Sequence, residues 1–461
     1  MKFTLKAPPS IGQFESTNGN QYTVGTSGTI SVPLLDLADA IAGGFLPTGP
    51  TTDPVSQAEG GTGSSTGIGL KPADTGAVFE QRIFNYPMAL MNGGFTFQDI
   101  YGVPFYNEPC LVRAVYENDT TSSYTINTSA VSSGRAFEPN PLTSGSGSNA
   151  AWTIAASGLV VPAASGVAGV RSYAATPWTF LQMDARTDGS PFGALYLRTY
   201  VSAAGRCVVG NSSNDVTTWH GQNFHNDHES HVEGGDFASA NQSTFVPAIT
   251  NSQYVAGHIQ VLSLKRSIVI AGAGDSTTQG LTTYGQHDSF VAQAAELLST
   301  VAKPVGWANY GSAGQTTTTF FQQATSVLAD IQRLPTILII QPASVNDSNY
   351  FTTAAINASY SGALQLALLC KQNGVLPVFR TMPPSGLSSA QEIVRNALNA
   401  TIRNSGFPYL DVDAVLSDNA SPVATLLPQF NSGDNVHWTA AGHAAVAALL
   451  VTSVLPALNV H

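Results

Sequence analysis

The sequence predicts a multidomain protein whose C-terminal part is a three-layer α/β domain. Throughout residues 266–461, short apolar runs alternate with helical patterns, and this alternation favours a parallel sheet covered by helices on both faces. Residues 76–262 instead contain short strand candidates separated by turn-rich stretches, which is typical of a β-sandwich or jelly roll. A small N-terminal module, residues 1–46, and a linker, residues 47–75, are expected ahead of both domains.

Composition narrows the function classes. The chain has 461 residues, too many for one ordinary core, and a net charge of −11 from 29 acidic and 18 basic residues,. A negative chain without a Lys/Arg cluster is not expected to bind nucleic acid. Three cysteines, Cys110, Cys207 and Cys370, are too few for a disulfide framework, so we expect buried, unpaired thiols and folding in a reducing cytoplasm.

The N-terminal module carries weak local signals. Alternating residues predict strands at Gln21–Val24 and Thr29–Val32, and Leu34–Ile41 has apolar residues at helical spacing,. Residues 47–75 are rich in Gly, Ser, Thr and Pro, the composition of a flexible linker,. The sequence shows no apolar signal-peptide core and no uninterrupted 18-residue apolar run, so neither an export signal nor membrane insertion is expected.

A segment of the linker, Pro54–Gly63 (PVSQAEGGTG), suggests a setting for the protein. With two extra residues, it resembles the PVSxGGTG segment that recurs in phage tail fibres. The resemblance implies a tail fibre or tailspike-like virion protein, made in the host cytoplasm without a signal peptide and acting outside the cell. Residues 1–46 are then expected to anchor it to other virion proteins. A trimeric homo-oligomer suits this setting, although no coiled-coil heptad is visible.

Strands of the β domain are expected where apolar and β-branched residues alternate. Ala194–Val201 is the clearest, and further strands are expected at Trp152–Ala155, Thr179–Met183 and Arg206–Val209,. A domain of this kind either binds carbohydrate or serves as a scaffold, and the sequence leaves both interpretations open.

Residues 263–461 should contain five strands, each followed by a helix. The strands are expected at Ser267–Ala273, Pro304–Tyr310, Thr336–Gln341, Leu376–Thr381 and Tyr409–Val412, and the helices near 287–301, 317–333, 353–373, 388–404 and 439–454. In open α/β sheets, sites lie at the carboxyl ends of the strands.

Two polar motifs predict a nucleophile and its base. The first strand ends in Gly-Asp-Ser, where Ser276 can project its hydroxyl into a cleft, and a serine needs a base to act as a nucleophile,. Asp434 and His437 lie three positions apart near the C-terminus, a spacing in which the carboxylate can hold Nδ1–H and leave Nε2 for the serine. The alternatives are a helix-capping serine and a polar cap before the last helix.

Two other strand ends carry groups that can face an oxyanion. The second strand leads into Asn309–Thr317, in which Gly311 and Gly314 allow close backbone approach,. The third leads into Ser344-Val345-Asn346-Asp347, in which Asn346 can aim its side-chain amide at the same place. A glycine-rich turn and an Asx turn are the ordinary alternatives.

Together, the motifs resemble a known family. Their order, Gly-Asp-Ser, Asn-x-Gly-x-x-Gly, x-x-Asn-Asp and Asp-x-x-His, is similar to the four sequence blocks of the SGNH (GDSL) hydrolases, over residues 266–461. The resemblance implies a flavodoxin-like parallel sheet and ester hydrolysis without a metal or cofactor. It also implies that Ser276 is the nucleophile, His437 the general base and acid, and Asp434 the residue that orients His437.

The same resemblance implies an oxyanion hole. Its donors are the N–H groups of Ser276 and Gly314 and the side-chain amide of Asn346. One position departs from the family pattern, because Ser344 stands where the third block usually has glycine. That serine either changes the local packing or adds a hydroxyl near the site.

A histidine-rich stretch of the β domain is a weaker candidate site. It contains His220, His225, His228 and His231 together with Asp227, Glu229, Glu233 and Asp236. Imidazoles and carboxylates can bind zinc or another divalent ion, with His225, His228 and His231 as the candidates, but the spacing matches no metal motif. We expect a solvated polar loop and no metal.

The expected activity is removal of O-acetyl groups from an acetylated polysaccharide on the host surface. A general small-acyl esterase or lipase is one alternative, which a deep apolar acyl pocket would favour. A catalytically inactive virion decoration or adhesion protein is another. A binding-only protein would have no need of Ser276, Asn346, Asp434 and His437 together.

Overall fold

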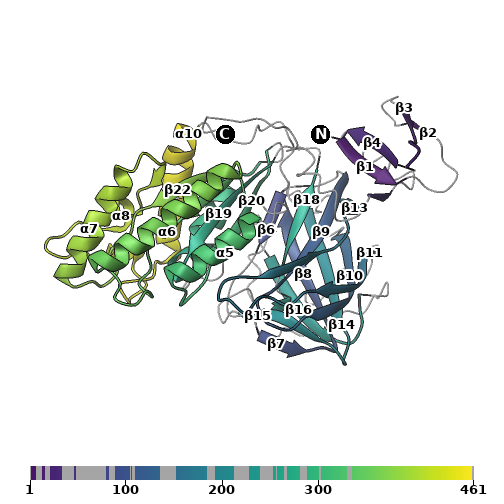
Figure 1. Cartoon of the computed structure of the whole chain (residues 1–461), viewed down its shortest axis with the longest axis horizontal. Helices are drawn as coiled ribbons and strands as arrows, with labels where there is room; N and C mark the ends of the chain where they lie inside the picture. Colours follow the sequence, from purple (N-terminus) through teal and green to yellow (C-terminus); the bar gives the residue numbers. More distant parts are fainter. Residues whose placement is uncertain are drawn as a thin grey trace.

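The computed structural model describes most of the chain from residue 89 onward and short segments before it. The described residues are 2–6, 13–15, 21–27, 29–33, 46–47, 79–82, 89–103, 105, 109–134, 152–183, 193–211, 228–238, 253–255, 257–263, 267–280, 288–300, 303–329 and 335–458. Figure 1 shows a set of short N-terminal strands, an all-β region and an α/β domain with helices on both sides of its sheet. The predicted helix at Leu34–Ile41 and nearly all of the linker lie outside the described residues.

The α/β domain has the predicted parallel sheet. Its strands are β19 (Ile268–Gly274), β20 (Val305–Gly311), β21 (Ile337–Ile340), β22 (Leu376–Arg380) and β23 (Tyr409–Leu410). They pair in parallel in the order β20-β19-β21-β22-β23. Strands β19, β20, β21 and β22 are almost wholly buried because both faces of the sheet are covered by helices,. Strand β19 therefore lies between β20 and β21, and its carboxyl end adjoins theirs.

Helices cover the two faces of this sheet separately. They are α3 (Ser276–Gln279), α4 (Phe290–Leu298), α5 (Thr317–Ala329), α6 (Thr353–Gln372), α7 (Ser389–Arg403), α8 (Val412–Leu416), α9 (Ala440–Leu449) and α10 (Leu455–Ala457), with the short 3₁₀ helix η4 (Pro428–Phe430) and a π-helical segment η5 (Leu450–Val454). Helices α5, α6 and α7 pack on one face, and α4 and α9 pack on the other. The five predicted helices are all present.

The all-β region contains strands of three sheets, one of which is the three-stranded sheet β17-β15-β7. Its strands are β6 (Phe79–Arg82), β7 (Ala89–Asn92), β8 (Phe95–Val103), β9 (Pro109–Asn118), β10 (Tyr124–Gly134), β11 (Thr153–Val161), β12 (Ser172–Ala175), β13 (Thr179–Gln182), β14 (Gly193–Val201), β15 (Arg206–Asn211), β16 (His228–Gly234), β17 (Gln253–Val255) and β18 (Gly257–Leu262). One antiparallel sheet has the order β11-β10-β14-β8-β16. It packs against β9, whose Tyr116 hydroxyl lies 2.8 Å from both Ser129 Oγ and Thr199 Oγ1. The two-sheet packing suits a sandwich, and a jelly-roll connectivity stays a prediction.

One sheet runs through both the all-β region and the α/β domain. Strand β6 pairs in parallel with β20 and antiparallel with β18, and β18 pairs with β9. The ten-stranded sheet therefore extends from β12 to β23, and Figure 1 shows β9, β18 and β6 continuing into β20 and β19. The boundary expected near residue 262 falls between two strands of this shared sheet, and side chains of both regions join one apolar core.

The N-terminal strands form two small sheets. They are β1 (Lys2–Lys6), β2 (Gln13–Glu15), β3 (Gln21–Thr23), β4 (Thr29–Pro33) and β5 (Leu46–Pro47). β1 pairs with β4 and β5, and β2 pairs with β3. The two strands expected in this module correspond to β3 and β4, whereas β1, β2 and β5 were not predicted.

The three cysteines are buried, and none of them forms a disulfide bond. Burial raises the pKa of both Cys207 and Cys370 to about 12. These two thiols therefore stay protonated at neutral pH and behave as small apolar side chains.

One helical stretch among the described residues, Ala440–Ala457, is long and apolar enough to cross a membrane by length and composition alone. Its Val446, Ala447 and Leu450 are nevertheless buried in the core that α4 also joins. A core helix that packs on a sheet has the same composition.

Candidate active site

The nucleophile turn is built directly on the central strand. Strand β19 ends at Gly274, and Asp275 caps helix α3 by accepting a 2.9 Å hydrogen bond from Thr277 N–H. A Cβ at Gly274 would lie 2.1 Å from Thr278 Oγ1, so only glycine lets the chain turn here,. Ser276 thus becomes the first residue of α3, nearly buried at the carboxyl edge of the sheet.

The structure brings Ser276, His437 and Asp434 into one hydrogen-bonded chain. Ser276 Oγ lies 2.8 Å from His437 Nε2, although 161 positions separate the two residues. His437 Nδ1 lies 2.5 Å from Asp434 Oδ2. Asp434 Oδ1 also accepts the backbone N–H groups of Val436 and His437, at 2.9 and 2.8 Å. The two residues therefore share one tight turn, as their spacing predicts.

Asp434 is held as a carboxylate. Partial burial acts to raise its pKa, but hydrogen bonds from the His437 ring and from two backbone N–H groups outweigh that effect and lower the pKa to about 2,. Asp434 is therefore negatively charged at any pH where an imidazole can serve as a base. A carboxylate in this position fixes the ring orientation and favours the tautomer with its proton on Nδ1.

The predicted oxyanion donors lie on three neighbouring strand ends. Gly314 adopts a φ of 72°, and a Cβ built there would have no atom within 4 Å beyond its chain neighbours, so this turn is open. Asn346 Nδ2 donates a 3.1 Å hydrogen bond to Gln315 O, which places the amide beside the Gly314 turn. Because β19, β20 and β21 are adjacent and parallel, Ser276, Gly314 and Asn346 share one edge of the sheet.

Asn309 and Gly311 support the nucleophile helix. Asn309 Nδ2 donates to the carbonyls of Thr278 and Gln279, at 3.2 and 3.1 Å, and so satisfies the C-terminal end of α3,. A Cβ at Gly311 would lie 2.3 Å from Gln279 N. Asn309 and Gly311 therefore let α3 lie close against β20.

Gln341 was not predicted to support the site, and no partner was predicted for Ser344. Gln341 Oε1 accepts a hydrogen bond from Asp275 N–H at 3.1 Å, and its Nε2 donates to Asp275 Oδ2 at 2.7 Å. Ser344 Oγ donates to the same carboxylate oxygen at 2.7 Å. The available signal was a lone polar residue directly after the four buried aliphatic residues of β21.

His443 is a second histidine close to the site, although the sequence showed no partner for it. It is fully buried, accepts a 3.2 Å hydrogen bond from Phe290 N–H at Nδ1, and stacks on the Phe290 ring. Burial lowers its pKa to about 3, and the charges of Arg380 and His437 act in the same direction. His443 is therefore neutral at physiological pH.

Metal binding by the histidine-rich stretch of the β domain stays untested. His225 lies outside the described residues, and only the backbone of His228 and His231, on β16, is described. Among the side chains that the structure does describe, no three His, Cys, Asp or Glu residues group as a metal site would require. The expectation of a loop is wrong for His228–Gly234, which form strand β16 and pair with β8, and it stays a prediction for residues 220–227, which lie outside the described residues.

The fold and the site together define a class of protein. A Ser–His–Asp chain at the carboxyl edge of a parallel α/β sheet is the arrangement of a serine hydrolase. Residues 273–445 match the GDSL-like Lipase/Acylhydrolase family, and this range contains all five predicted site residues. The C-terminal part of the chain is therefore a GDSL (SGNH) hydrolase domain, a kind of domain that hydrolyses carboxylic esters.

Several solved structures resemble part of the chain. They include a putative lipolytic protein of the G-D-S-L family from Desulfitobacterium hafniense DCB-2 (17% identity, 40% of this chain and 97% of that one, TM-score 0.33), the psychrotrophic esterase EstA from Pseudoalteromonas sp. (13%, 41% and 98%, 0.33) and the lipase/acylhydrolase from Enterococcus faecalis (17%, 41% and 96%, 0.32). No curated protein matches the chain.

Proposed function

We propose that this protein is a serine esterase in which Ser276 is the nucleophile, His437 the general base and Asp434 the group that orients the base. The observation that carries the proposal is the hydrogen-bonded chain from Ser276 Oγ to His437 Nε2 at 2.8 Å, and from His437 Nδ1 to Asp434 Oδ2 at 2.5 Å. A hydroxyl that touches an imidazole held in this tautomer is the arrangement that activates a serine.

The reaction has two halves. As Ser276 Oγ bonds to the ester carbonyl carbon, its proton moves to His437 Nε2 and the carbonyl oxygen becomes an oxyanion. Collapse breaks the ester C–O bond, and the proton on Nε2 goes to the leaving alcohol. Water then attacks the acyl-serine, gives a proton to His437 Nε2, and releases the carboxylic acid as Ser276 regains its hydrogen.

The oxyanion would be stabilised by donors that surround the serine. We assign this role to the backbone N–H groups of Ser276 and Gly314 and to the side-chain amide of Asn346. Support comes from their placement at the ends of three adjacent strands and from the open space at Gly314. Loss of one such donor typically costs about 10²–10³ in rate.

We further propose that the substrate is an O-acetyl group on a host surface polysaccharide and that the protein belongs to a phage particle. The tail-fibre-like string at Pro54–Gly63 supports the virion setting. The polysaccharide substrate is inferred from that setting together with the esterase site.

The esterase proposal is tested by the hydrolysis of p-nitrophenyl esters. We expect the purified protein to cleave the acetate faster than the octanoate, and Ser276→Ala to abolish cleavage while circular dichroism stays native. Unchanged activity of Ser276→Ala would rule out the proposed nucleophile. Equal or faster cleavage of the octanoate would rule out an acetyl esterase and favour a general esterase or lipase.

The polysaccharide proposal requires its own experiment. Acetylated host surface polysaccharide should release acetate with the wild-type protein and none with Ser276→Ala, as measured by an enzymatic acetate assay. Chemically deacetylated polysaccharide is the matched control. Cleavage of p-nitrophenyl acetate without acetate release from any host polysaccharide would leave the esterase standing and reject this substrate.

A further inference from the structure

We propose that Arg380, the last residue of β22, is a positioning residue that sets Ser276 and His437 relative to one another. The proposal rests on the serine esterase function above. Arg380 contacts the residue that follows the serine and the residue that follows the histidine: its Nη2 donates a 2.6 Å hydrogen bond to Thr277 Oγ1, and its guanidinium carbon lies 5.2 Å from the ring centre of Trp438.

On the serine side, the contact is part of a chain of hydrogen bonds. Thr277 Oγ1 accepts from Arg380 and donates to Asp275 Oδ1 at 2.7 Å, and Thr277 N–H donates to the same oxygen at 2.9 Å. Ser276 is therefore flanked on both sides by residues of this chain. Displacement of Arg380 would release the first turn of α3, where the nucleophile lies.

On the histidine side, the contact is with a buried aromatic ring. Trp438 is fully buried between Arg380 and the ring of His443, whose centre lies 4.9 Å from that of Trp438. A guanidinium within about 6 Å of an indole ring is attracted to its face. Because Trp438 directly follows His437, its packing fixes the backbone that carries the base.

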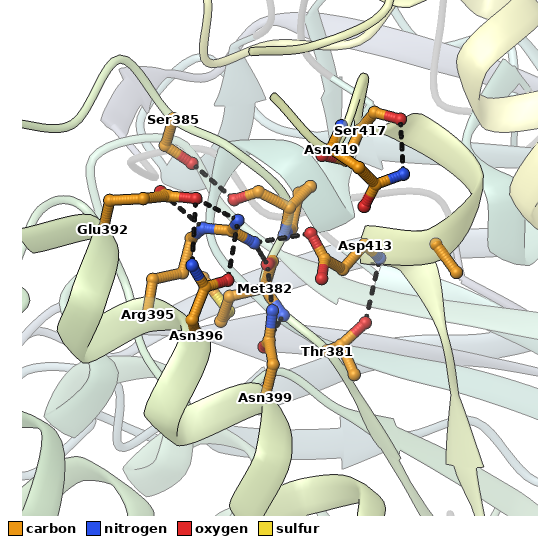
Figure 2. Close-up of polar contacts among 12 residues, drawn as sticks. Thr381, Met382, Ser385, Glu392, Arg395, Asn396, Asn399, Asp413, Ser417 and Asn419 are labelled. Carbon is orange, nitrogen blue, oxygen red and sulfur yellow. Dashed lines mark hydrogen bonds and ion pairs between the residues drawn. The ribbon is translucent and has the colours of Figure 1, made fainter. Parts of the chain in front are cut away.

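The strand end that carries Arg380 is itself held firmly. Asp413 N–H donates to Thr381 Oγ1 at 2.9 Å, and both Arg395 and Asn399 donate to Met382 O, at 2.6 and 2.8 Å (Figure 2). Asn399 Oδ1 also accepts the Met382 N–H at 2.8 Å. A side chain that starts from such a fixed backbone can hold a constant position between the first turn of α3, which carries Ser276, and the turn that carries His437.

Arg380 is costly to the fold, which argues against a purely structural role. It is buried, and among the described residues its Nε and Nη1 have no hydrogen-bond partner. Burial lowers the pKa of Arg380 to about 10, although Asp275 acts against this, so the group is still charged at neutral pH. A buried cation with unpaired donors normally destabilises a protein. Its placement between the nucleophile and the base offers a reason to keep it.

The test compares Arg380→Met, Arg380→Lys and Thr277→Val in the full chain with p-nitrophenyl acetate. We expect kcat to fall by about 10–10²-fold in Arg380→Met with KM within twofold, because misplacement of the reacting groups acts on the chemical step. Arg380→Lys should recover part of kcat. The effects of Arg380→Met and Thr277→Val should be far from additive, since both break the same contact.

The matched control is Lys371→Met, which removes another cation from above an aromatic ring, Phe407, at 4.2 Å. It should leave kcat unchanged. If Arg380→Met keeps the wild-type kcat, or if its loss is fully additive with Thr277→Val, the positioning role is wrong. Parallel circular dichroism and thermal melts must show a folded protein, and if Arg380→Met does not fold, Arg380→Lys and Thr277→Val carry the comparison. Retained activity in Ser276→Ala would instead overturn the esterase proposal itself, so the two failures are distinguishable.

Discussion

Ser344 Oγ donates a 2.7 Å hydrogen bond to Asp275 Oδ2, the carboxylate beside the nucleophile. The same hydroxyl oxygen accepts the backbone N–H of Asn346 at 3.1 Å. The residue that departs from the family pattern therefore joins the nucleophile turn to the strand end that carries a predicted oxyanion donor. Ser344 is fully buried, so water cannot replace these contacts at low cost,.

Ser344→Ala tests the contribution of this hydroxyl. The substitution removes a hydrogen bond to the buried side chain of Asp275, and we expect the free energy of unfolding to fall by about 1–3 kcal/mol in urea titrations,. Asp275 keeps its hydrogen bond from Gln341, so kcat should fall by less than about tenfold. Ser453→Ala, at an exposed position in the π-helical segment η5, is the control and should change neither quantity. An unchanged unfolding midpoint in Ser344→Ala would show that the bond contributes nothing.

Asp434→Asn tests the orientation of the base. An amide can no longer hold the Nδ1–H tautomer as a carboxylate does, and we expect kcat to fall by about 10²–10⁴-fold with little change in KM. Because the pKa of Asp434 is lowered to about 2, the wild-type carboxylate stays ionised from pH 8 down to pH 4. The loss of activity should therefore be present at the pH where the wild type is most active and should not require a pH above 5 to ionise the carboxylate. A variant as active as the wild type at the wild-type pH optimum would contradict the orienting role.

Much of the α/β domain was predictable because its signals are local. Parallel strands covered on both faces are buried along their length and so tend to form continuous apolar runs, as Ile337–Ile340 does,. Helix ends were equally visible, as at Ser388, which forms a capping box with Gln391,. The nucleophile and the Asp–His pair could be identified for a similar reason, because each motif is contiguous in the chain and its order is fixed.

The all-β region was less predictable because some of its buried positions are polar. Strand β9 is almost wholly buried, yet it contains Arg113 and Glu117. Arg113 donates to Gln260 at 2.6 Å, and Glu117 forms a 2.8 Å ion pair with Arg171. These partners are distant in sequence, so the polar letters interrupt the apolar pattern that marks a strand.

Residues that support the site were missed for the same reason. Gln341 reaches Asp275 across 66 positions, and Arg380 reaches Thr277 across 103. Neither residue has a motif of its own, and each gains its role only when the parallel sheet brings the strand ends together. Such roles follow from the fold and not from local sequence.

His443→Gln tests the buried, neutral state of His443. The unfolded imidazole binds a proton below about pH 6.5, whereas the folded one stays neutral until about pH 3,. Between about pH 3 and pH 6.5 the unfolded state therefore holds more protons than the folded state,. As the pH is lowered through this range, this group should reduce the wild-type free energy of unfolding by up to about 1.4 kcal/mol per pH unit. Glutamine keeps an acceptor for the Phe290 N–H but does not titrate.

The measurement is a series of urea titrations from pH 7 to pH 4 for both proteins. The stability advantage of the wild type over His443→Gln should shrink steadily as the pH falls. Carboxylates that titrate in the same range affect both proteins alike, so they cancel in the difference. A difference that does not change with pH would show that His443 takes up its proton equally well in the folded protein.

Arg395→Met tests the ionic cluster that Arg395 forms with Glu392 and Asp413, next to the loop that follows β22. The Arg395 guanidinium is buried and pairs with Glu392 and Asp413, both at 2.5 Å (Figure 2). Its removal leaves Glu392 buried without its cation and Asp413 with only the ion pair to Arg403, and we expect the free energy of unfolding to fall by about 3–5 kcal/mol. Arg403→Met is the matched control, because Arg403 also pairs with Asp413 but is about one-third exposed. That variant should lose no more than about 1 kcal/mol.

The double variant Arg395→Met with Glu392→Gln tests whether uncompensated charge or a packing defect causes the loss of stability. If uncompensated charge causes the loss, neutralising Glu392 should restore part of the stability that Arg395→Met removes, whereas a packing defect would not be rescued. Urea titrations of the two single variants and the double variant supply the coupling free energy. Equal losses in Arg395→Met and Arg403→Met, or a double variant no more stable than Arg395→Met, would show that the charges in this cluster do not stabilise the loop.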